Sequence, residues 1–130
     1  MFRILVGFIL ILSYSGNINN DKKPYYVEVR ATAYCPCEKC CGKFADGTTS
    51  TGRDAYLPGI AVDPKKIPLG SHVDIPGYKR GPNKNGSWIL CDDVGGKIKD
   101  WHIDVRFKTH QEALNWGVKR VKIRVHPKAN

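Results

Sequence analysis

The sequence predicts a small, mainly β domain with one short helix. Six short segments either alternate apolar and polar residues or form brief apolar runs, as β-strands do. Only the segment 109–117 combines a helix-capping pattern with apolar residues at helical spacing. The chain has 130 residues, 42% of them hydrophobic and 25% charged, which is typical of a single globular domain. Many short strands with irregular connections and one helix favour a small six-stranded β-barrel.

The six predicted strands follow one another with turn residues between them. The first and the last have the longest alternating patterns, with Val, Ile or Ala on one face and mostly charged or polar residues on the other. Asn85-Gly86 is a hairpin-type turn, and prolines end two of the inner strands. The predicted strands are 26–34, 59–63, 71–75, 87–93, 101–107 and 118–125.

The one predicted helix begins after Thr109. In the run Thr109-His-Gln-Glu112, the first and last side chains can each accept a hydrogen bond from the backbone N–H of the other residue, which makes a capping box. Apolar residues follow at 113, 114 and 116, and Gly117 can end the helix.

The amino-terminal residues have the pattern of a secretory signal peptide. Arg3 precedes an apolar run at 4–12, and small residues near position 15 offer a cleavage site. An uncleaved membrane anchor is the alternative interpretation, although no apolar run reaches the roughly 18 residues that span a bilayer. We therefore expect an exported protein of the cell envelope or exterior, with no transmembrane span in the mature chain. The predicted divisions are a signal peptide at 1–15, a linker at 16–25 and a domain at 26–126.

The chain is strongly basic, which indicates an anionic partner or an anionic environment. It has 21 Lys and Arg against 12 Asp and Glu, a formal net charge of +9. The outward row Arg120, Lys122 and Arg124 could attract nucleic acid. However, no recognition helix or RNA-binding signature accompanies it, and export makes wall polymers the expected anion. We therefore predict no nucleic-acid partner.

Carboxylates end or interrupt several of the apolar strand segments. Asp63 and Asp93 each close a strand, and Asp104 lies on the polar face of its strand, with His102 and Arg106. A carboxylic acid in a half-buried cleft near other carboxylates has a raised pKa and can hold a proton near neutral pH. Acid catalysis of glycosidic cleavage needs such a group. Aspartates at strand ends also accept backbone hydrogen bonds in turns, and spacing alone favours that structural role.

Short motifs through most of the chain follow one another as in a known family. They are Ala31-Thr-Ala-Tyr-Cys-Pro-Cys37, Cys40-Cys41-Gly42, Thr51-Gly52, Gly59-Ile-Ala-Val-Asp-Pro64, Ile67-Pro-Leu-Gly70, Ile75-Pro-Gly-Tyr78, Asp93-Val-Gly-Gly-Lys-Ile-Lys99 and Ile103-Asp104. In this order they resemble the 3D domain, a family named for three aspartates and similar to the catalytic barrel of membrane-bound lytic transglycosylase A. The resemblance covers about residues 30 to 125.

The resemblance implies a double-psi β-barrel that acts on peptidoglycan glycan strands. Such enzymes cut the β-1,4 bond between N-acetylmuramic acid and N-acetylglucosamine without water, and the muramic acid 6-hydroxyl attacks its own anomeric carbon to leave a 1,6-anhydro end. One carboxyl group acts first as an acid and then as a base, and no cofactor or metal is implied. A non-catalytic, expansin-like barrel that only binds wall polysaccharide is the alternative. The oligomeric state is not predicted.

The resemblance also assigns site residues. The three aspartates of the family fall on Asp63, Asp93 and Asp104, with Asp104 as the catalytic acid/base. Asp63 and Asp93 are expected to line the groove, raise the pKa of Asp104 and stabilise positive charge on the sugar. Asp100 stands where the family usually has a glycine. Lys97 or Lys99 could contact the peptide carboxylates or the lactyl group of the substrate, with solvated surface lysines as the alternative. Independently of the resemblance, Tyr78 and Trp101 flank loops and are expected to stack on sugar faces.

Cysteine usage permits two interpretations. Four of the five cysteines lie within seven positions, and the fifth lies next to Asp92. Export favours disulfides, and a bridge from Cys91 to the cluster would tie the Asp93 loop over the groove. A metal site needs four suitably spaced ligands, and no spacing recruits His72 or His102 to the cluster. We therefore predict disulfides and no metal among Cys35, Cys37, Cys40, Cys41 and Cys91.

Overall fold

The computed structural model describes residues 22–129, and the predicted signal peptide at 1–15 lies outside them, as does most of the linker. Within the described residues no helix is both long enough and apolar enough to cross a bilayer. The elements in chain order are β1 (Tyr25–Tyr34), α2 (Glu38–Cys41), η1 (Gly42–Phe44), β2 (Ile60–Ala61), β3 (His72–Asp74), β4 (Ile89–Asp93), β5 (His102–Arg106), α3 (His110–Trp116) and β6 (Lys119–His126).

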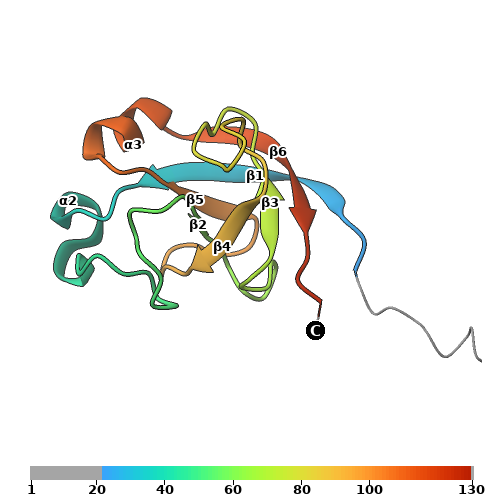
Figure 1. The fold of residues 1–130 in the computed structure, drawn as a ribbon, viewed down its shortest axis with the longest axis horizontal. Coiled ribbons are helices and arrows are strands. Elements are labelled where there is room, and N and C mark those ends of the chain that lie inside the picture. The colour runs from blue at the N-terminus through green and yellow to red at the C-terminus, as the bar shows by residue number, and fades with distance from the viewer. Residues whose placement is uncertain (1–21, 130) are drawn as a thin grey trace, which may run out of the picture.

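The six strands hydrogen-bond in an order that closes on itself, β1-β5-β2-β4-β3-β6, and so form a closed barrel. β1 runs parallel to β5, and β2 runs parallel to β4, while the other pairs are antiparallel. Figure 1 shows β1 and β6 as the two longest strands, side by side, with α2 and α3 at the same end of the molecule. All six strands predicted from the sequence are present, although the inner four are shorter than predicted.

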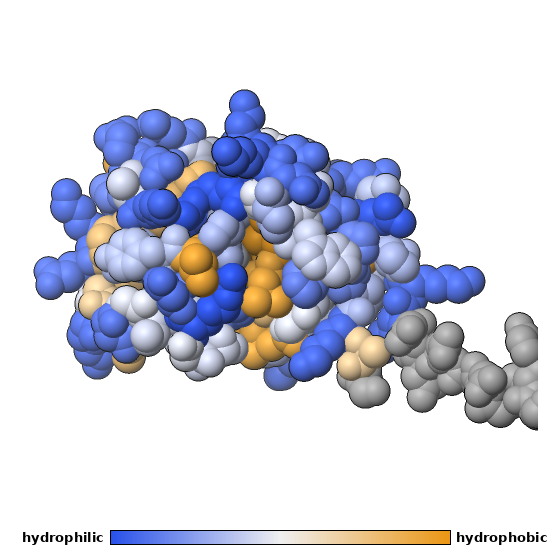
Figure 2. Space-filling view, in the orientation of Figure 1, coloured by the Kyte–Doolittle hydropathy of each residue, from blue (hydrophilic) through white to orange (hydrophobic). Residues whose placement is uncertain are grey.

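Alternation in the two long strands places their apolar residues in the core. Val29 on β1 and Ile123 and Val125 on β6 are fully buried, whereas the basic row of β6 faces outward, as predicted. Some apolar residues stay exposed, and Figure 2 shows them as a band within a mostly hydrophilic face. The buried core cluster is Val29, Ala31, Ile60, Val62, Ile67, Val73, Ile75, Tyr78, Ile89, Cys91, Ile103, Val105, Trp116, Ile123 and Val125.

The predicted helix is confirmed as α3, together with its capping box. The Thr109 hydroxyl accepts from the Glu112 backbone N–H at 3.2 Å, and the Glu112 carboxylate accepts from the Thr109 N–H at 3.1 Å. Trp116 near the end of α3 is buried, and its indole N–H donates to the carbonyl of Ala31, which anchors the helix on β1. The two short helical elements α2 and η1 were not predicted, because the sequence of this segment has no apolar periodicity.

An arginine on β5 is fully buried, contrary to the polar, accessible face predicted for this strand. The guanidinium of Arg106 meets the buried Asp92 carboxylate through two bonds of 2.8 Å each and also donates to the carbonyl of Leu57. The same guanidinium donates to the hydroxyl of Tyr34 at 3.1 Å. Gly59 lies so close that a Cβ there would collide with both ion-pair side chains. A buried charge pair of this kind is tolerated because its hydrogen bonds are all satisfied.

Removing one partner of this pair should cost most of the stability of a small domain. We expect Asp92→Ala to lower the free energy of unfolding by about 3–5 kcal/mol, because the Arg106 charge would be left buried without a counter-charge. Urea unfolding followed by fluorescence measures the loss. As a control, Glu28→Ala breaks the exposed pair with Arg120, whose side chains are 61% and 69% exposed, and should cost at most about 1 kcal/mol. Similar losses in both variants would contradict the role given to Asp92.

Candidate functional site

A groove with a volume of about 510 Å³ opens beside the carboxyl-terminal end of β4. One wall consists of most of the segment 40–50, which contains the end of α2 and all of η1. The opposite wall is the loop after β4, with Val94, Gly95, Gly96 and Ile98. Two of the three predicted aspartates, Asp93 and Asp104, line this groove. Two strands that are separate in sequence therefore bring a pair of carboxylates to one solvent-connected hollow.

Asp104 lies on β5 beside β1, in register with Thr32. The Thr32 hydroxyl donates to Asp104 Oδ1 at 2.9 Å, and His102 Nε2 lies 2.7 Å from the same hydroxyl oxygen. Because a hydroxyl has a single proton, a Thr32 side chain that donates to Asp104 must accept its bond from the His102 N–H. Burial is the largest effect on His102 and lowers its pKa. The chain His102–Thr32–Asp104 thus orients the carboxyl group.

The surroundings of Asp104 favour its protonated form. Burial is the largest effect, and together with the nearby charge of Asp93 it raises the pKa of Asp104 to about 6. The hydrogen bond from Thr32 and the charge of Arg30 act in the opposite direction. A carboxyl group with this pKa can donate a proton near neutral pH and accept one afterwards, which acid/base catalysis requires.

Asp93 ends β4 and is held by three donors. Its carboxylate accepts from the Tyr34 hydroxyl at 2.7 Å and from the backbone N–H groups of Ser50 and Val94 at 2.9 Å each. Tyr34 in turn accepts from Arg106, so the groove carboxylate is connected to the buried ion pair. These contacts hold a negative charge at a defined place in the groove.

Asp63 does not line the groove, and the expectation that it does is wrong. Its carboxylate accepts from the backbone N–H groups of Asp100 at 2.8 Å and Lys65 at 3.1 Å, and these bonds hold its pKa below the usual range. Asp100 has a φ of 59°, a left-handed conformation that glycine adopts most easily, which explains the usual family glycine. Asp63 is therefore a positioning residue that holds the end of the loop carrying Gly95 and Gly96.

The four predicted substrate-contacting residues are spread over different environments. Tyr78 is fully buried, and its hydroxyl donates to the backbone carbonyl of Arg106. Because its ring cannot stack on a sugar from this position, the prediction that Tyr78 contacts substrate is wrong. Trp101 is 36% exposed but is not part of the groove lining. Lys97 and Lys99 are exposed on the groove-side loop without lining the groove itself.

The cysteines divide into a surface cluster and one core residue. Cys35 and Cys37 form a disulfide-bonded pair, whereas Cys40 and Cys41 are free and line the groove. Cys91 is a free, buried thiol in the core, where burial raises its pKa, so the predicted bridge from Cys91 to the cluster is wrong. The physical reason is strand alternation, which turns Cys91 on β4 toward the barrel interior.

His110 is a neighbour of the cysteine cluster that the sequence reasoning missed. Its Nδ1 lies 3.4 Å from the Sγ of Cys40 and 3.9 Å from the Sγ of Cys35. Seventy positions separate His110 from Cys40, so no local spacing connects the two. The only available signal was a histidine at the start of the one convincing helix.

Comparison with known proteins decides the family. A family model described as "3D domain" matches residues 59–126, just over half of the chain. The chain belongs to the 3D domain family. The matched region includes Asp63, Asp93 and Asp104, the positions on which the resemblance places the three aspartates.

Two relatives from Bacillus subtilis (strain 168) match most of this chain. The cell wall-binding protein YocH is 38% identical over 85% of this chain and 36% of its own length, and the putative cell wall shaping protein YabE is 35% identical over 82% and 24%. This 3D domain chain therefore spans about a quarter to a third of the length of these two relatives. A crystal structure of MltA from E. coli aligns with a TM-score of 0.46 and 22% identity, over 68% of this chain and 29% of that one.

Direct titration should show that Asp104 keeps its proton to about pH 6. Carboxyl-carbon NMR of the protein labelled at aspartate measures the pKa values. Asp93→Asn removes a neighbouring negative charge and should lower the pKa of Asp104, whereas Thr32→Val removes a hydrogen bond to the ionised form and should raise it. Asp100→Asn is the control, because asparagine tolerates the left-handed backbone at this position, and it should leave the pKa of Asp104 unchanged. An Asp104 that titrates near 4 in the unmodified protein would contradict this description of the groove.

Proposed function

We propose that this 3D domain chain is a peptidoglycan-cleaving lytic transglycosylase with Asp104 as its acid/base. One observation carries the proposal: the groove holds a carboxyl group whose pKa is raised to about 6, oriented by Thr32 and lying near the carboxylate of Asp93. The groove between segment 40–50 and the loop after β4 has a volume of about 510 Å³, which is room for part of a glycan strand.

The chemistry needs one group that acts twice. Protonated Asp104 donates its proton to the glycosidic oxygen, and the bond from that oxygen to the anomeric carbon breaks. Asp104, now ionised, then accepts the proton of the muramic acid 6-hydroxyl as this oxygen bonds to the anomeric carbon. The product is a 1,6-anhydro end, no water is consumed, and no second carboxylate is required as nucleophile.

Asp93 has a different role, because its three hydrogen bonds fix it in place. Its charge is directed at the region where the sugar ring becomes oxocarbenium-like, and it stabilises that positive charge. The same charge contributes to the raised pKa of Asp104, so one carboxylate supports both the acid and the transition state. His102 behind Thr32 acts as a positioning residue.

Charge and family membership support a location in the cell envelope. The net charge of +9 suits binding to anionic wall polymers. YocH is a cell wall-binding protein and YabE a putative cell wall shaping protein, and we propose that this chain also acts at the cell wall. The closed order of six strands supports the double-psi form of barrel that the family resemblance implies.

A non-catalytic wall-binding barrel is the second candidate. The description of YocH as a cell wall-binding protein favours it. In that case Asp104 and Asp93 would accept hydrogen bonds from sugar hydroxyls, and the groove would hold a glycan strand without breaking it.

Digestion of purified peptidoglycan distinguishes the two candidates. We expect fragments lighter by one water molecule than the corresponding reducing-end muropeptides, detected by mass spectrometry. Asp104→Asn should reduce their release by about 10²-fold or more while binding to sacculi persists. Asp100→Asn makes the same chemical change outside the groove and should keep the activity. Reducing-end products would mean a hydrolase, and retention on sacculi without any release would favour the binding barrel.

The pH profile of cleavage should follow the titration of Asp104. The first step needs the protonated acid, so the rate should decline as the pH rises above about 6. Asp93→Asn should move this decline to lower pH, because the charge that raises the pKa of Asp104 is gone. Initial rates of anhydro-product release across pH 4–9 would show the shift. A decline that stays in place in Asp93→Asn would contradict the coupling between the two carboxylates.

A further inference from the structure

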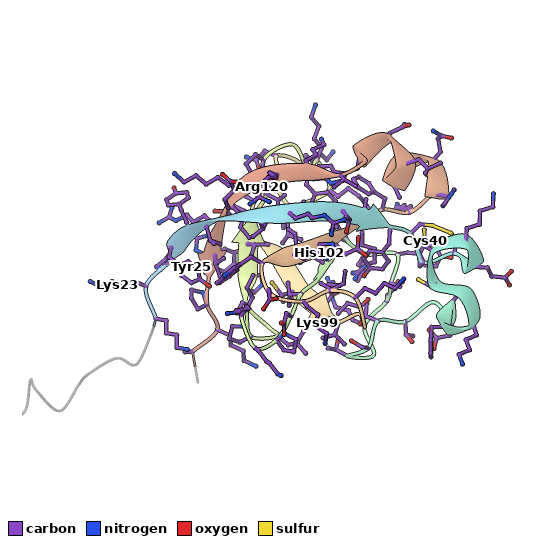
Figure 3. All side chains as sticks on the ribbon, turned by 180° about the vertical axis from the view of Figure 1, so that it is seen from behind. Lys23, Tyr25, Cys40, Lys99, His102 and Arg120 are labelled. Carbon is purple, nitrogen blue, oxygen red and sulfur yellow. A yellow bond between two sulfur atoms is a disulfide. The ribbon has the colours of Figure 1, made fainter. Side chains whose placement is uncertain are left out.

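Three cysteines and one histidine converge at the end of the barrel where β1 leads into α2. The ligand-capable atoms of Cys35, Cys37, Cys40 and His110 all lie within 4.8 Å of one another. Figure 3 shows Cys40 beside the sulfur–sulfur bond at this end of the molecule. We propose that in the reduced chain these four residues bind one structural zinc ion. The proposal departs from the prediction of no metal and does not depend on the proposed function.

The donor set is the one that structural zinc sites use. Three thiolates and one imidazole nitrogen bind zinc tetrahedrally, with Zn–S distances of about 2.3 Å and Zn–N distances of about 2.0–2.1 Å. Cys37 and Cys40 have the two-residue separation common in such sites. The Sγ of Cys40 lies 2.9 Å from the Sγ of Cys35 and 3.4 Å from Nδ1 of His110, so atoms from separate elements already surround one point.

Each ligand is held by local structure before any metal binds. The N–H groups of Cys40 and Cys41 donate to the Cys37 carbonyl at 3.1 Å and 2.8 Å, which makes a tight turn between the two cysteines. Cys35 is fully buried directly after β1. His110 is the first residue of α3, and the capping box at Thr109 fixes this end of the helix. Such a preformed arrangement lowers the conformational cost of binding.

The metal would stabilise a segment that lacks a core of its own. Neither α2 nor η1 has a buried residue, yet this segment forms one wall of the groove. A zinc ion would tie the segment to β1 through Cys35 and to α3 through His110. Four protein ligands leave no open position, so the ion would be structural rather than catalytic. Cys41 is not a ligand, because its thiol donates to the Cys35 carbonyl.

The disulfide and the zinc site are alternative states of the same sulfur atoms. A sulfur atom in the Cys35–Cys37 bond has no thiolate to offer. A dithiol reductant must first supply two electrons and two protons to break this bond and is itself oxidised to a disulfide. Zinc binding then releases the protons of the three ligating thiols into solution, and no electron is transferred.

Metal analysis of the full chain tests the proposal. Purified without oxygen in the presence of dithiothreitol and then freed of excess metal, the protein should retain about one zinc ion per chain, measured by plasma mass spectrometry. Cys40→Ser and His110→Ala should lose it, whereas His110→Cys should keep it, because a fourth thiolate completes a tetrahedral site. Cys41→Ser is the matched control, adjacent to the ligands, and should also keep the ion.

Cobalt(II) provides a readout that does not depend on the variants folding. Added to the reduced, metal-free chain, it should give intense thiolate-to-cobalt absorption and the visible bands of tetrahedral cobalt, and zinc should displace it. A reduced chain that binds neither metal would overturn the proposal, as would zinc retained by His110→Ala but lost from Cys41→Ser. Neither measurement uses peptidoglycan, so the result stands apart from the test of cleavage.

Discussion

The buried ion pair between Asp92 and Arg106 is the interaction on which the rest of the structure depends. The pair connects β4 to β5. The Arg106 guanidinium also donates hydrogen bonds to the carbonyl of Leu57 and to the hydroxyl of Tyr34. Arg53 adds a second positive charge to the Asp92 carboxylate. Replacing such a pair by apolar residues is often neutral for stability, but removing one partner is costly. The pair therefore constrains the loop before β2, the end of β1 and both strands at once.

The same strands carry the chemistry beside the ion pair. Asp93 follows Asp92 directly, and Asp104 precedes Arg106 by two residues. Arg106 neutralises Asp92, whereas the described contacts of Asp93 are with a hydroxyl and backbone N–H groups, so the charge of Asp93 still acts on Asp104.

The raised pKa of Asp104 also makes the stability of the domain depend on pH. The folded chain binds this proton more tightly than the unfolded chain does, so the contribution of Asp104 to stability is lost as the pH rises from about 4 to above 6.

The strand pattern was predictable because it is a local property of the sequence. Alternation in β1 and β6 and the capping box of α3 identified the elements and most of the core. The buried Arg106 was not predictable, because alternation gives the face of a strand but not whether that face meets solvent or another polar side chain. Tyr78 was misplaced for a similar reason, since a Pro-Gly turn suggests a surface loop while the ring packs against Phe107 and Trp116. The role of His110 depends on a contact over 70 residues, which no local pattern reveals.

The two walls of the groove are held in physically different ways. The side with Asp93 and Asp104 belongs to the barrel strands β4 and β5, most of whose residues are buried in the core. The opposite wall, α2 and η1, buries no residue and is tied to the barrel through Cys35, the residues around it and the contacts of segment 46–51. This wall is also tied to the site, because the Ser50 N–H donates to the Asp93 carboxylate and the Ser50 hydroxyl accepts from the Val94 N–H. Because the charge of Asp93 raises the pKa of Asp104, the position of this wall and the acid/base chemistry of the groove are linked through Asp93.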